Sequence, residues 1–267
     1  MSAAATLSEL TAGLRSDPAR SAILLDVDGT LAPVVRDPEQ ASVPELLRRQ
    51  LLLVTERYGF VACVSGRRAA VARRIVGLGT IPYAGNHGVE LLRRGAAEPE
   101  VDPQAERWAA RVHAVAGAAG EDRLRAAGLR LEDKGPIVAV HWRAADDPAR
   151  AEQLAAEIAR EAETHGLAVH RGRKVLELRP PVPIGKDRAV RRLLEGTDVD
   201  MALYAGDDRT DVDAFAGLRS LVAEGRLTSA LCVGVRSDES PSELLEEADL
   251  LVPAGDGVRA LLAALTS

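Results

Sequence analysis

Short, continuously apolar segments alternate with amphipathic segments along most of this chain. The apolar runs lie at 22–26, 60–64, 81–84, 201–205, 230–235 and 249–252. Helical patterns separate them at about 42–57, 68–77, 186–195, 211–217, 241–247 and 256–265. Strands that are apolar without alternation are buried on both faces, as in a parallel sheet that is covered by helices on each side. The pattern therefore predicts an α/β fold with such a sheet as its core.

The middle of the chain follows another pattern. After a Gly-, Pro- and Glu-rich stretch, helices are expected at about 104–118 and 148–164. Strands are expected near 128–134, 137–143, 167–171 and 173–179. These elements describe a small α+β module inserted into the core, and a proline-rich linker follows it. We therefore expect a core domain of 1–100 and 180–267 and an inserted domain of 101–179.

Composition narrows the classes of partner. The net charge of −6 gives no electrostatic support for binding nucleic acid, and no apolar run approaches the length that spans a membrane. The first residues lack the pattern of a secretion signal. Cys63 and Cys232 lie in apolar, strand-like contexts typical of buried reduced thiols. We therefore expect a cytoplasmic protein, a monomer, that acts on a small molecule.

Two aspartates follow the first apolar run directly. Residues 26–30 read Asp-Val-Asp-Gly-Thr, so Asp26 and Asp28 project the same way from an extended backbone. Carboxylates held this close repel each other unless a cation or a shared proton relieves the repulsion. A solvated turn after a core strand also accounts for Asp and Gly here. The pair indicates either such a turn or a metal-dependent site with one nucleophile and one acid/base group.

A second acidic segment follows a later apolar run and favours the metal-dependent site. Asp207 and Asp208 come directly after the run at 201–205, and Asp211 follows three residues later. The carboxyl ends of parallel strands meet at one edge of a sheet, which would bring Asp26 and Asp207 together. Mg²⁺ prefers carboxylate, water and phosphate oxygens. The sequence therefore predicts a Mg²⁺ site built from two strand ends.

One lysine stands out because the chain contains few of them. Of its 34 basic residues only Lys134, Lys174 and Lys186 are lysines. Lys186 begins an amphipathic helix, where a cation is mildly unfavourable to the helix dipole. A solvated residue of the first turn is one interpretation. A compact ammonium group that contacts a phosphate is the other, and the dipole argument favours it.

Two polar segments follow other strands. Ser65 and Arg67 lie where a strand gives way to a helix, so Ser65 is either an ordinary N-cap or a donor to a phosphate. Asn86 and His87 lie between two glycines after the next strand, where a tight turn also accounts for them.

Strand alternation sorts the residues of the inserted domain by face. His141 and Arg143 share one face of their strand, and Arg173, Glu177 and Arg179 share one face of theirs. A solvated polar face is one interpretation. The other is a polar surface over the catalytic site whose charged groups reach sugar hydroxyls. Spacing leaves both open.

Taken together, these segments resemble the haloacid-dehalogenase-like (HAD) phosphatases. The four motifs of that superfamily match, in order, Asp26-x-Asp28-Gly29-Thr30, Ser65, Lys186 and Asp207-Asp208-x-x-Asp211. The place of the insertion matches the larger α+β cap of the superfamily. Within it, the chain is similar to the trehalose-6-phosphate phosphatases over roughly 20–255, through the segments Ser65–Arg67, Gly85–Glu90, His141–Arg143, Gly172–Glu177 and Gly206–Asp211.

The resemblance implies a role for each matching residue. Asp26 would be the nucleophile that forms an aspartyl phosphate, and Asp28 the acid and then the base. Lys186 and Ser65 would orient the phosphoryl group. Mg²⁺ would be held by Asp26, Asp28 and Asp207, with Asp208 and Asp211 acting through water. Candidate substrate contacts are Arg67, Asn86, His87, His141, Arg143, Arg173 and Glu177.

The activity implied is the hydrolysis of trehalose 6-phosphate to trehalose and phosphate, as in trehalose biosynthesis. A phosphatase for another phosphorylated disaccharide or pseudo-disaccharide is an alternative. A phosphomutase would return the phosphoryl group to the sugar. A non-catalytic sugar-phosphate-binding subunit is a further alternative, against which the presence of both Asp26 and Asp28 argues.

Overall fold

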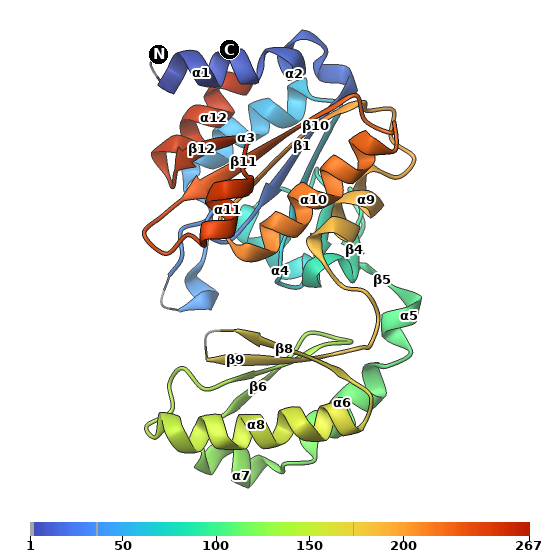
Figure 1. Ribbon diagram of the computed structural model, residues 1–267, viewed down its shortest axis with the longest axis vertical. Coiled ribbons are helices and arrows are strands. Elements are labelled where there is room, and N and C mark those ends of the chain that lie inside the picture. The colour runs from blue at the N-terminus through green and yellow to red at the C-terminus, as the bar shows by residue number, and fades with distance from the viewer. Residues whose placement is uncertain (1–2, 36, 173) are drawn as a thin grey trace. The chain divides into compact units, whose positions relative to one another are not determined.

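The computed structural model describes residues 3–35, 37–172 and 174–267, which form two compact units (Figure 1). The larger unit comprises Met1–Glu100 and Ile184–Ser267, and the second unit comprises Val101–Pro183. The proline-rich residues 180–183, which we expected at the return to the core, thus group with the second unit. No helix in the described ranges combines the length and the apolar character needed to cross a bilayer.

The larger unit contains a sheet of eight strands in the order β12-β11-β10-β1-β2-β3-β4-β5. Their bounds are β1 Ser21–Asp26, β2 Phe60–Val64, β3 Tyr83–Gly85, β4 Glu90–Leu92, β5 Glu100–Val101, β10 Met201–Gly206, β11 Ser229–Arg236 and β12 Leu250–Pro253. The strands from β12 to β3 are parallel, as predicted. β4 is antiparallel to β3 because only a short turn joins them, and a parallel pair requires a long crossover.

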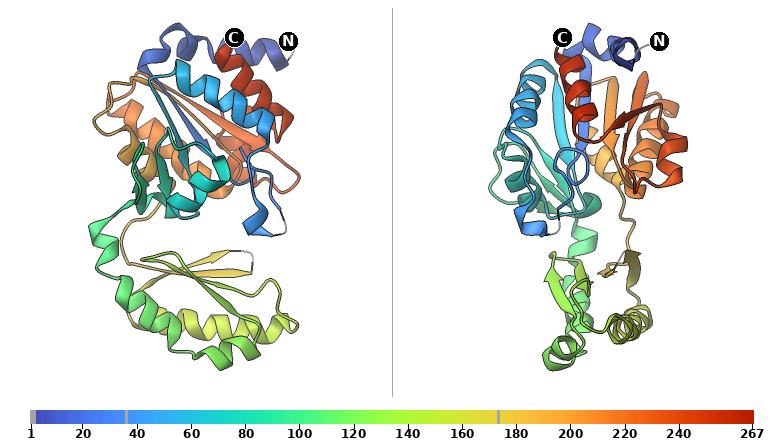
Figure 2. Two further views of the ribbon diagram at one scale, coloured as in Figure 1. Left: turned by 180° about the vertical axis from the view of Figure 1, so that it is seen from behind. Right: turned by 90° about the vertical axis from the view of Figure 1, so that its left-hand side faces the viewer.

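Helices cover both faces of this sheet (Figure 2). Their bounds are α1 Ala3–Leu10, α2 Ala12–Ser16, α3 Glu45–Arg57, α4 Ala69–Val76, α9 Lys186–Leu194, α10 Arg209–Ala223, α11 Ser242–Glu247 and α12 Asp256–Thr266. In β1, Ile23 and Leu25 pack with α3, α4 and α12, whereas Ala22 and Leu24 pack with α9 and α10. Because both faces of β1 are buried, its side chains are apolar up to Asp26.

The second unit has an antiparallel sheet of four strands in the order β6-β7-β9-β8. Its elements are α5 Pro103–Glu106, α6 Ala109–Gly117, α7 Glu121–Ala126, β6 Arg130–Asp133, β7 Val138–His141, α8 Pro148–Thr164, β8 Ala168–Gly172 and β9 Val175–Arg179. The helix expected at 104–118 is interrupted, since the amide of Trp108 donates to the carbonyl of Ala105, only three residues earlier. The helix α7 was not expected.

The two faces of this smaller sheet differ in character. Val138 and Val140 of β7 and Leu176 and Leu178 of β9 lie in a core with α6 and α8. Glu177 lies on the other face by strand alternation, as does His141, which is partly exposed. The predicted alternation therefore holds for the strand residues that are described, while Arg173 lies outside them.

Candidate active site

The candidate site lies where the strand order of the larger sheet reverses. From β1 the chain continues to β2 and β3 on one side, and to β10, β11 and β12 on the other. The register pairs Asp26 with Val64 and Leu25 with Ala205. Ser65 and Asp207 therefore follow their strands at the same edge as Asp26. Such a switch point at the carboxyl ends of strands is where α/β sheets bind ligands.

Lys186 connects the two acidic segments. Its Nζ donates to Oδ1 of Asp26 at 2.6 Å and to Oδ1 of Asp211 at 2.6 Å. All three residues are buried, with exposures of 2% for Lys186, 4% for Asp26 and 0% for Asp211. Lys186 is the first residue of α9, so that helix directs its cation at the end of β1.

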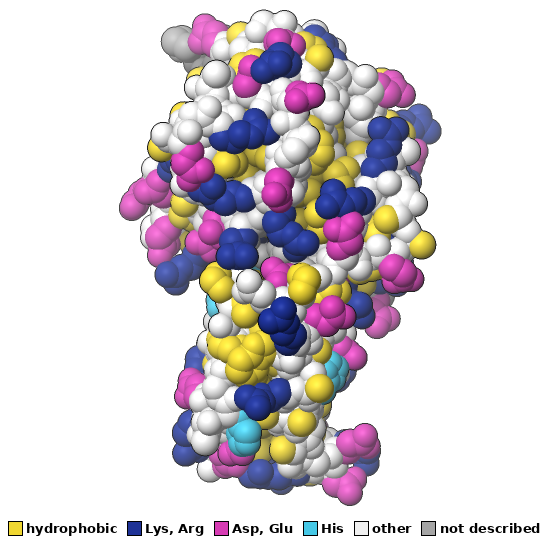
Figure 3. Space-filling view, turned by 90° about the vertical axis from the view of Figure 1, so that its right-hand side faces the viewer, with side chains coloured by type: hydrophobic (Ala, Val, Ile, Leu, Met, Phe, Trp, Pro, Cys, Tyr) yellow, Lys and Arg dark blue, Asp and Glu magenta, His cyan; other side chains and the backbone are white. Residues whose placement is uncertain are grey.

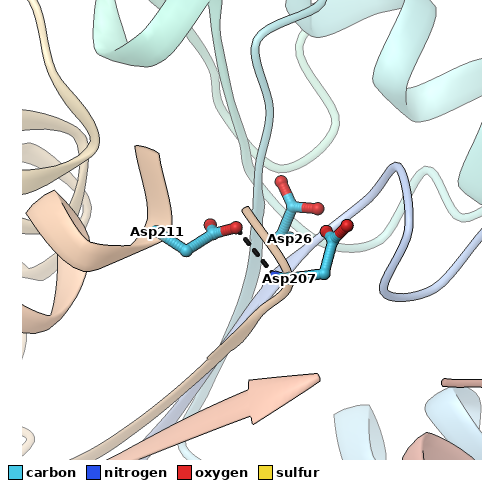
Figure 4. Close-up of side chains that lie close together, drawn as sticks. All are labelled: Asp26, Asp207 and Asp211. Carbon is cyan, nitrogen blue, oxygen red and sulfur yellow. Dashed lines mark hydrogen bonds between the residues drawn. The ribbon is translucent and has the colours of Figure 1, made fainter. Parts of the chain in front are cut away.

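Both carboxylate oxygens of Asp211 accept hydrogen bonds. Its Oδ1 also accepts from the hydroxyl of Tyr204 at 2.6 Å, and its Oδ2 accepts from the amides of Asp207 at 2.9 Å and Asp208 at 3.0 Å. Figure 4 shows Asp211 reaching from α10 towards the backbone of Asp207. Asp208 caps α10 by accepting from the amide of Thr210 at 2.7 Å. These bonds make Asp211 a residue that positions the loop after β10.

Burial shifts the proton affinities of this cluster. Burial, with only partial compensation from Lys186, raises the pKa of Asp26 well above its ordinary value, and it raises the pKa of Asp211 as well. Burial alone would lower the pKa of Lys186, but Asp211 and Asp26 outweigh it and raise the pKa. The ammonium therefore stays charged, and because the carboxylates around it outnumber it, burial and mutual repulsion favour their protonation when no other cation is bound.

Asp207 lies against the loop that follows β1. The hydroxyl of Thr30 donates to its Oδ1 at 3.3 Å. Gly29 has a φ of +88°, and a Cβ there would lie 2.0 Å from Oδ2 of Asp207, so only glycine permits this approach. Burial, and then the charges of Asp211 and Asp208, raise the pKa of Asp207 to about 7.

The carboxylates at this edge fit a hard divalent cation. Asp26, Asp207 and Asp211 each place an oxygen within 4.8 Å of the others (Figure 4). Hard cations such as Mg²⁺ take carboxylate oxygens, and a cation would relieve the raised pKa values. Because the bonds of Asp211 are already made, Asp26 and Asp207 are the members best able to ligate. A cavity of about 1010 Å³ reaches Asp207 and Thr30.

Asp28 forms a bidentate ion pair with Arg67. The guanidinium donates Nε to Oδ2 at 2.8 Å and Nη2 to Oδ1 at 2.5 Å, and its Nη1 donates to the carbonyl of Pro38 at 2.8 Å. Both side chains are partly exposed. A guanidinium therefore orients the carboxylate of Asp28.

Backbone hydrogen bonds join the loops that follow β2 and β3. The amide of His87 donates to the carbonyl of Ser65 at 3.0 Å, and the amide of Asn86 donates to the carbonyl of Arg67 at 2.7 Å. Asn86 and His87 have positive φ values of 49° and 54°. This strained conformation fixes the turn beside Ser65, whose buried hydroxyl accepts from the amide of Arg67 at 3.1 Å.

The candidate residues of the second unit have partners of their own. Glu177 accepts from Nζ of Lys134 at 2.9 Å and from Nε and Nη2 of Arg179 at 2.8 and 2.5 Å. His141 contacts a carboxylate oxygen of Glu132 at 2.7 Å. Arg143 is exposed, and Arg173 lies outside the described residues.

Sequence reasoning missed several of these partners. Tyr204, Lys134, Arg179 and Glu132 were not among the predicted site residues, although strand alternation had placed Arg179 on the face of Glu177. The rarity of lysine in this chain was a signal for Lys134 as well as for Lys186. Glu90 was also missed as a partner: it is fully buried and accepts from the amide of Ala69 at 2.8 Å at the start of α4.

Comparison with known proteins gives a consistent result. The model of the trehalose-phosphatase family matches residues 24–248. A rice protein described as "Probable trehalose-phosphate phosphatase 4" is 35% identical over 208 residues, which cover 74% of this chain and 55% of that protein. The chain therefore spans about half the length of that relative.

Solved structures share the fold. The structure of a "trehalose-6-phosphate phosphatase related protein" superimposes with a TM-score of 0.73 at 24% identity, covering 92% of this chain and 96% of the other. A haloacid dehalogenase-like hydrolase from Bacteroides thetaiotaomicron gives a TM-score of 0.63 at 14% identity, over 90% of this chain and 98% of that one. At these identities the likeness concerns the fold, and it confirms the predicted HAD-like α/β architecture.

Proposed function

This chain belongs to the trehalose-phosphatase family, and we propose that it hydrolyses trehalose 6-phosphate to trehalose and phosphate. The observation that carries the proposal is the buried carboxylate of Asp26. One of its oxygens is bound by Lys186, and a second aspartate follows two residues later. A fixed carboxylate beside a cation is the arrangement that nucleophilic attack on a phosphoryl group requires.

In the first step, an oxygen of Asp26 attacks phosphorus, and the bond from phosphorus to the sugar oxygen breaks. The departing oxygen takes a proton from the carboxyl group of Asp28, so trehalose leaves as a neutral alcohol. Asp28 must be protonated for this step, and a carboxylate in a bidentate pair with Arg67 only accepts hydrogen bonds. Protonation of Asp28 therefore replaces the bidentate pair by a single hydrogen bond, through which Arg67 still orients the other oxygen of the carboxyl group.

In the second step, water attacks the phosphorus of the aspartyl phosphate and transfers a proton to Asp28. The bond from phosphorus to Asp26 breaks, which frees phosphate and restores the carboxylate. Lys186 neutralises phosphoryl oxygens in both steps, and the hydroxyl of Ser65 orients them. Asp211 and Tyr204 keep the ammonium of Lys186 in place.

The metal proposed for the site is Mg²⁺, held by the side chains of Asp26 and Asp207 and by the backbone carbonyl of Asp28. Such an ion would supply charge to the phosphoryl oxygens during transfer. Asp208 and Asp211 would support it through water. The three carboxylates grouped around the one ammonium of Lys186 support this proposal.

Recognition of the sugar is proposed for His141, Arg143, Arg173 and Glu177 of the second unit, with Arg67, Asn86 and His87 of the larger unit. A carboxylate such as Glu177 accepts hydrogen bonds from sugar hydroxyls, and Lys134 and Arg179 hold it in place. We also place the protein in the cytoplasm, because its two cysteines are buried free thiols that suit a reducing compartment.

The test is phosphate release from a panel of sugar phosphates by the purified protein with Mg²⁺. We expect trehalose 6-phosphate to give the highest kcat/KM in the panel. Preference for another disaccharide phosphate would replace the substrate but keep the phosphatase. An isomeric sugar phosphate formed without free phosphate would indicate a phosphomutase, and no turnover of any substrate would indicate a binding subunit.

A further inference from the structure

A second cavity opens at the edge of the larger sheet that lies opposite the catalytic carboxylates. Its volume is about 650 Å³. It is bounded by the first residues of β2, the approach to β3, the end of β4 and the last turns of α3 and α9. Because β2 and β3 run parallel to β1, their first residues are at the far edge from Asp26. The cavity is therefore separate from the site described above.

The wall of this cavity combines apolar with polar surface. Its apolar lining residues are Leu52, Tyr58, Phe60, Val61, Ile81, Pro82, Leu91 and Leu193. The hydroxyl of Tyr58 donates to the carbonyl of Leu265 at 2.9 Å, so its ring is held in place. A volume of this size lies within the range of small-molecule sites, roughly 300–1,000 Å³.

Charged side chains of mostly one sign also line the cavity: Arg93, Arg94 and Arg192, with Glu56 as the acidic member. Arg93 is paired with Glu100 through bonds of 2.6 and 3.2 Å. Arg192 donates Nη1 to the carbonyls of Gly88 at 2.8 Å and Val89 at 3.3 Å, and its charge also interacts with the carboxylate of Glu100. Arg94 has no hydrogen bond or ion pair with any residue that the structure describes.

The charges that line the cavity indicate the sign of the charge on a ligand that would bind there. Arg94 and Arg192 together outweigh Glu56, which leaves a net charge of one positive unit once Arg93 is offset by Glu100. Figure 3 shows a face of the larger unit on which exposed apolar surface is bordered by Lys and Arg side chains. Apolar side chains beside a guanidinium suit a molecule that joins an apolar body to a single anionic group.

We propose that this cavity binds a small organic anion with an aromatic or other apolar body, and that Arg94 binds its anionic group. The ligand enters between α3 and the end of β4, and its apolar part lies against Tyr58, Phe60 and Leu91. The site is independent of the phosphatase chemistry, so its test does not depend on turnover.

The probe is 8-anilino-1-naphthalenesulfonate, an aromatic sulfonate with one negative charge, titrated into the folded full chain by calorimetry. We expect one saturable site per chain. Arg94→Glu should weaken binding about tenfold or more, since it replaces the cation by a repelling charge. Thr80→Trp should weaken it as much by filling the cavity from the loop before β3. Glu56→Gln should strengthen it by removing a repelling carboxylate.

Two controls keep the test specific. Arg160→Glu makes the same charge change on the exposed face of α8 in the second unit, and it should leave the affinity unchanged. Lys186→Ala removes the cation of the catalytic site without adding a competing anion, and it should leave the affinity for the probe unchanged. Circular dichroism and melting temperature establish that each variant is folded. The proposal is overturned if wild type shows no saturable binding, if folded Arg94→Glu and Thr80→Trp both bind as wild type does, or if folded Lys186→Ala no longer binds the probe.

Discussion

The catalytic edge of the larger unit and the polar sheet face of the second unit are both organised around ion pairs, but with opposite balances of charge. At the catalytic edge, one ammonium, Lys186, is shared between the carboxylates of Asp26 and Asp211. On the sheet face, one carboxylate, Glu177, is shared between Lys134 and Arg179. The first arrangement leaves excess negative charge and attracts a cation. The second leaves spare hydrogen-bond donors, which suit an oxygen-rich substrate.

The two regions also differ in how their partners are brought together. Lys186 is 160 residues from Asp26 in sequence, and strand and helix ends of the larger unit assemble the group. Glu177 and its partners all lie on β9 or just beyond the end of β6, within one small sheet. We infer that the larger unit determines whether the reaction occurs and that the second unit determines which sugar is accepted. The predictions that follow test this division, from the largest effect to the smallest.

Removing the nucleophile should give the largest effect. Asp26→Asn should lower kcat by about 10⁴-fold or more on every substrate, because an amide does not attack phosphorus. The fold should persist, since Asn keeps the size of the side chain. Phosphate release by the Asn variant at near wild-type rate would rule out the covalent mechanism.

Removing the metal should cause the next largest loss of activity. EDTA should abolish activity and Mg²⁺ should restore it, because the excess carboxylate charge at the site requires a cation. Asp207→Ala should raise the Mg²⁺ concentration needed for half-maximal rate by about tenfold or more. Asp238→Ala, a loop carboxylate lining the nearby cavity, should not raise it. Full activity after thorough chelation would contradict the assignment of a metal site.

Breaking the ion pair of Arg67 with Asp28 should lower kcat/KM by less than the two changes above. Arg67→Gln should lower kcat/KM by about tenfold on both trehalose 6-phosphate and p-nitrophenyl phosphate, because Asp28 loses the group that orients it. Equal loss on both substrates would show that Arg67 acts through the chemistry. A loss confined to the sugar phosphate would make it a contact to the sugar instead.

The smallest effect concerns stability and pH in metal-free protein. The pKa of Asp207 is about 7 in the folded chain because of burial, so the folded state holds a proton that the unfolded state has lost above pH about 4. This group's contribution to stability is therefore lost as pH rises towards 7. In EDTA, the melting temperature of Asp207→Asn should exceed that of wild type by a margin that grows from pH 5 to pH 7. A margin independent of pH would contradict the raised pKa.

Much of the larger unit could be predicted from sequence because its signals are local. Buried parallel strands are continuously apolar, and their order along the chain placed Asp26, Ser65 and Asp207 at one edge. The strands β4 and β5 were missed because runs of three and two residues carry no periodic signal. The contact of Tyr204 with Asp211 was missed because Tyr204 lies inside an apolar strand, where a tyrosine is expected to be an ordinary core residue.

In the second unit, the sequence predicted the fold better than it predicted the contacts of the candidate site residues. Alternation of β7 and β9 separated the apolar face from the polar face. It did not show that Lys134 would hold Glu177, because that pair depends on the register of β6, β7 and β9. The bond from Arg179 on the same strand depends on side-chain rotamers. The same limit applies to Arg67, which sequence suggested as a substrate contact and whose guanidinium the structure places on Asp28.

We infer that the larger unit carries out the chemistry and the second unit selects the sugar, and the ratio of kcat/KM for trehalose 6-phosphate to that for p-nitrophenyl phosphate separates these two roles. Glu177→Ala should lower this ratio by an amount equivalent to about 1–3 kcal/mol, because a small aromatic substrate makes no use of a carboxylate that reads sugar hydroxyls. Ser65→Ala, the matched change at the catalytic edge, should lower both values and leave the ratio unchanged. Equal losses on both substrates in Glu177→Ala, or a changed ratio in Ser65→Ala, would contradict the claim.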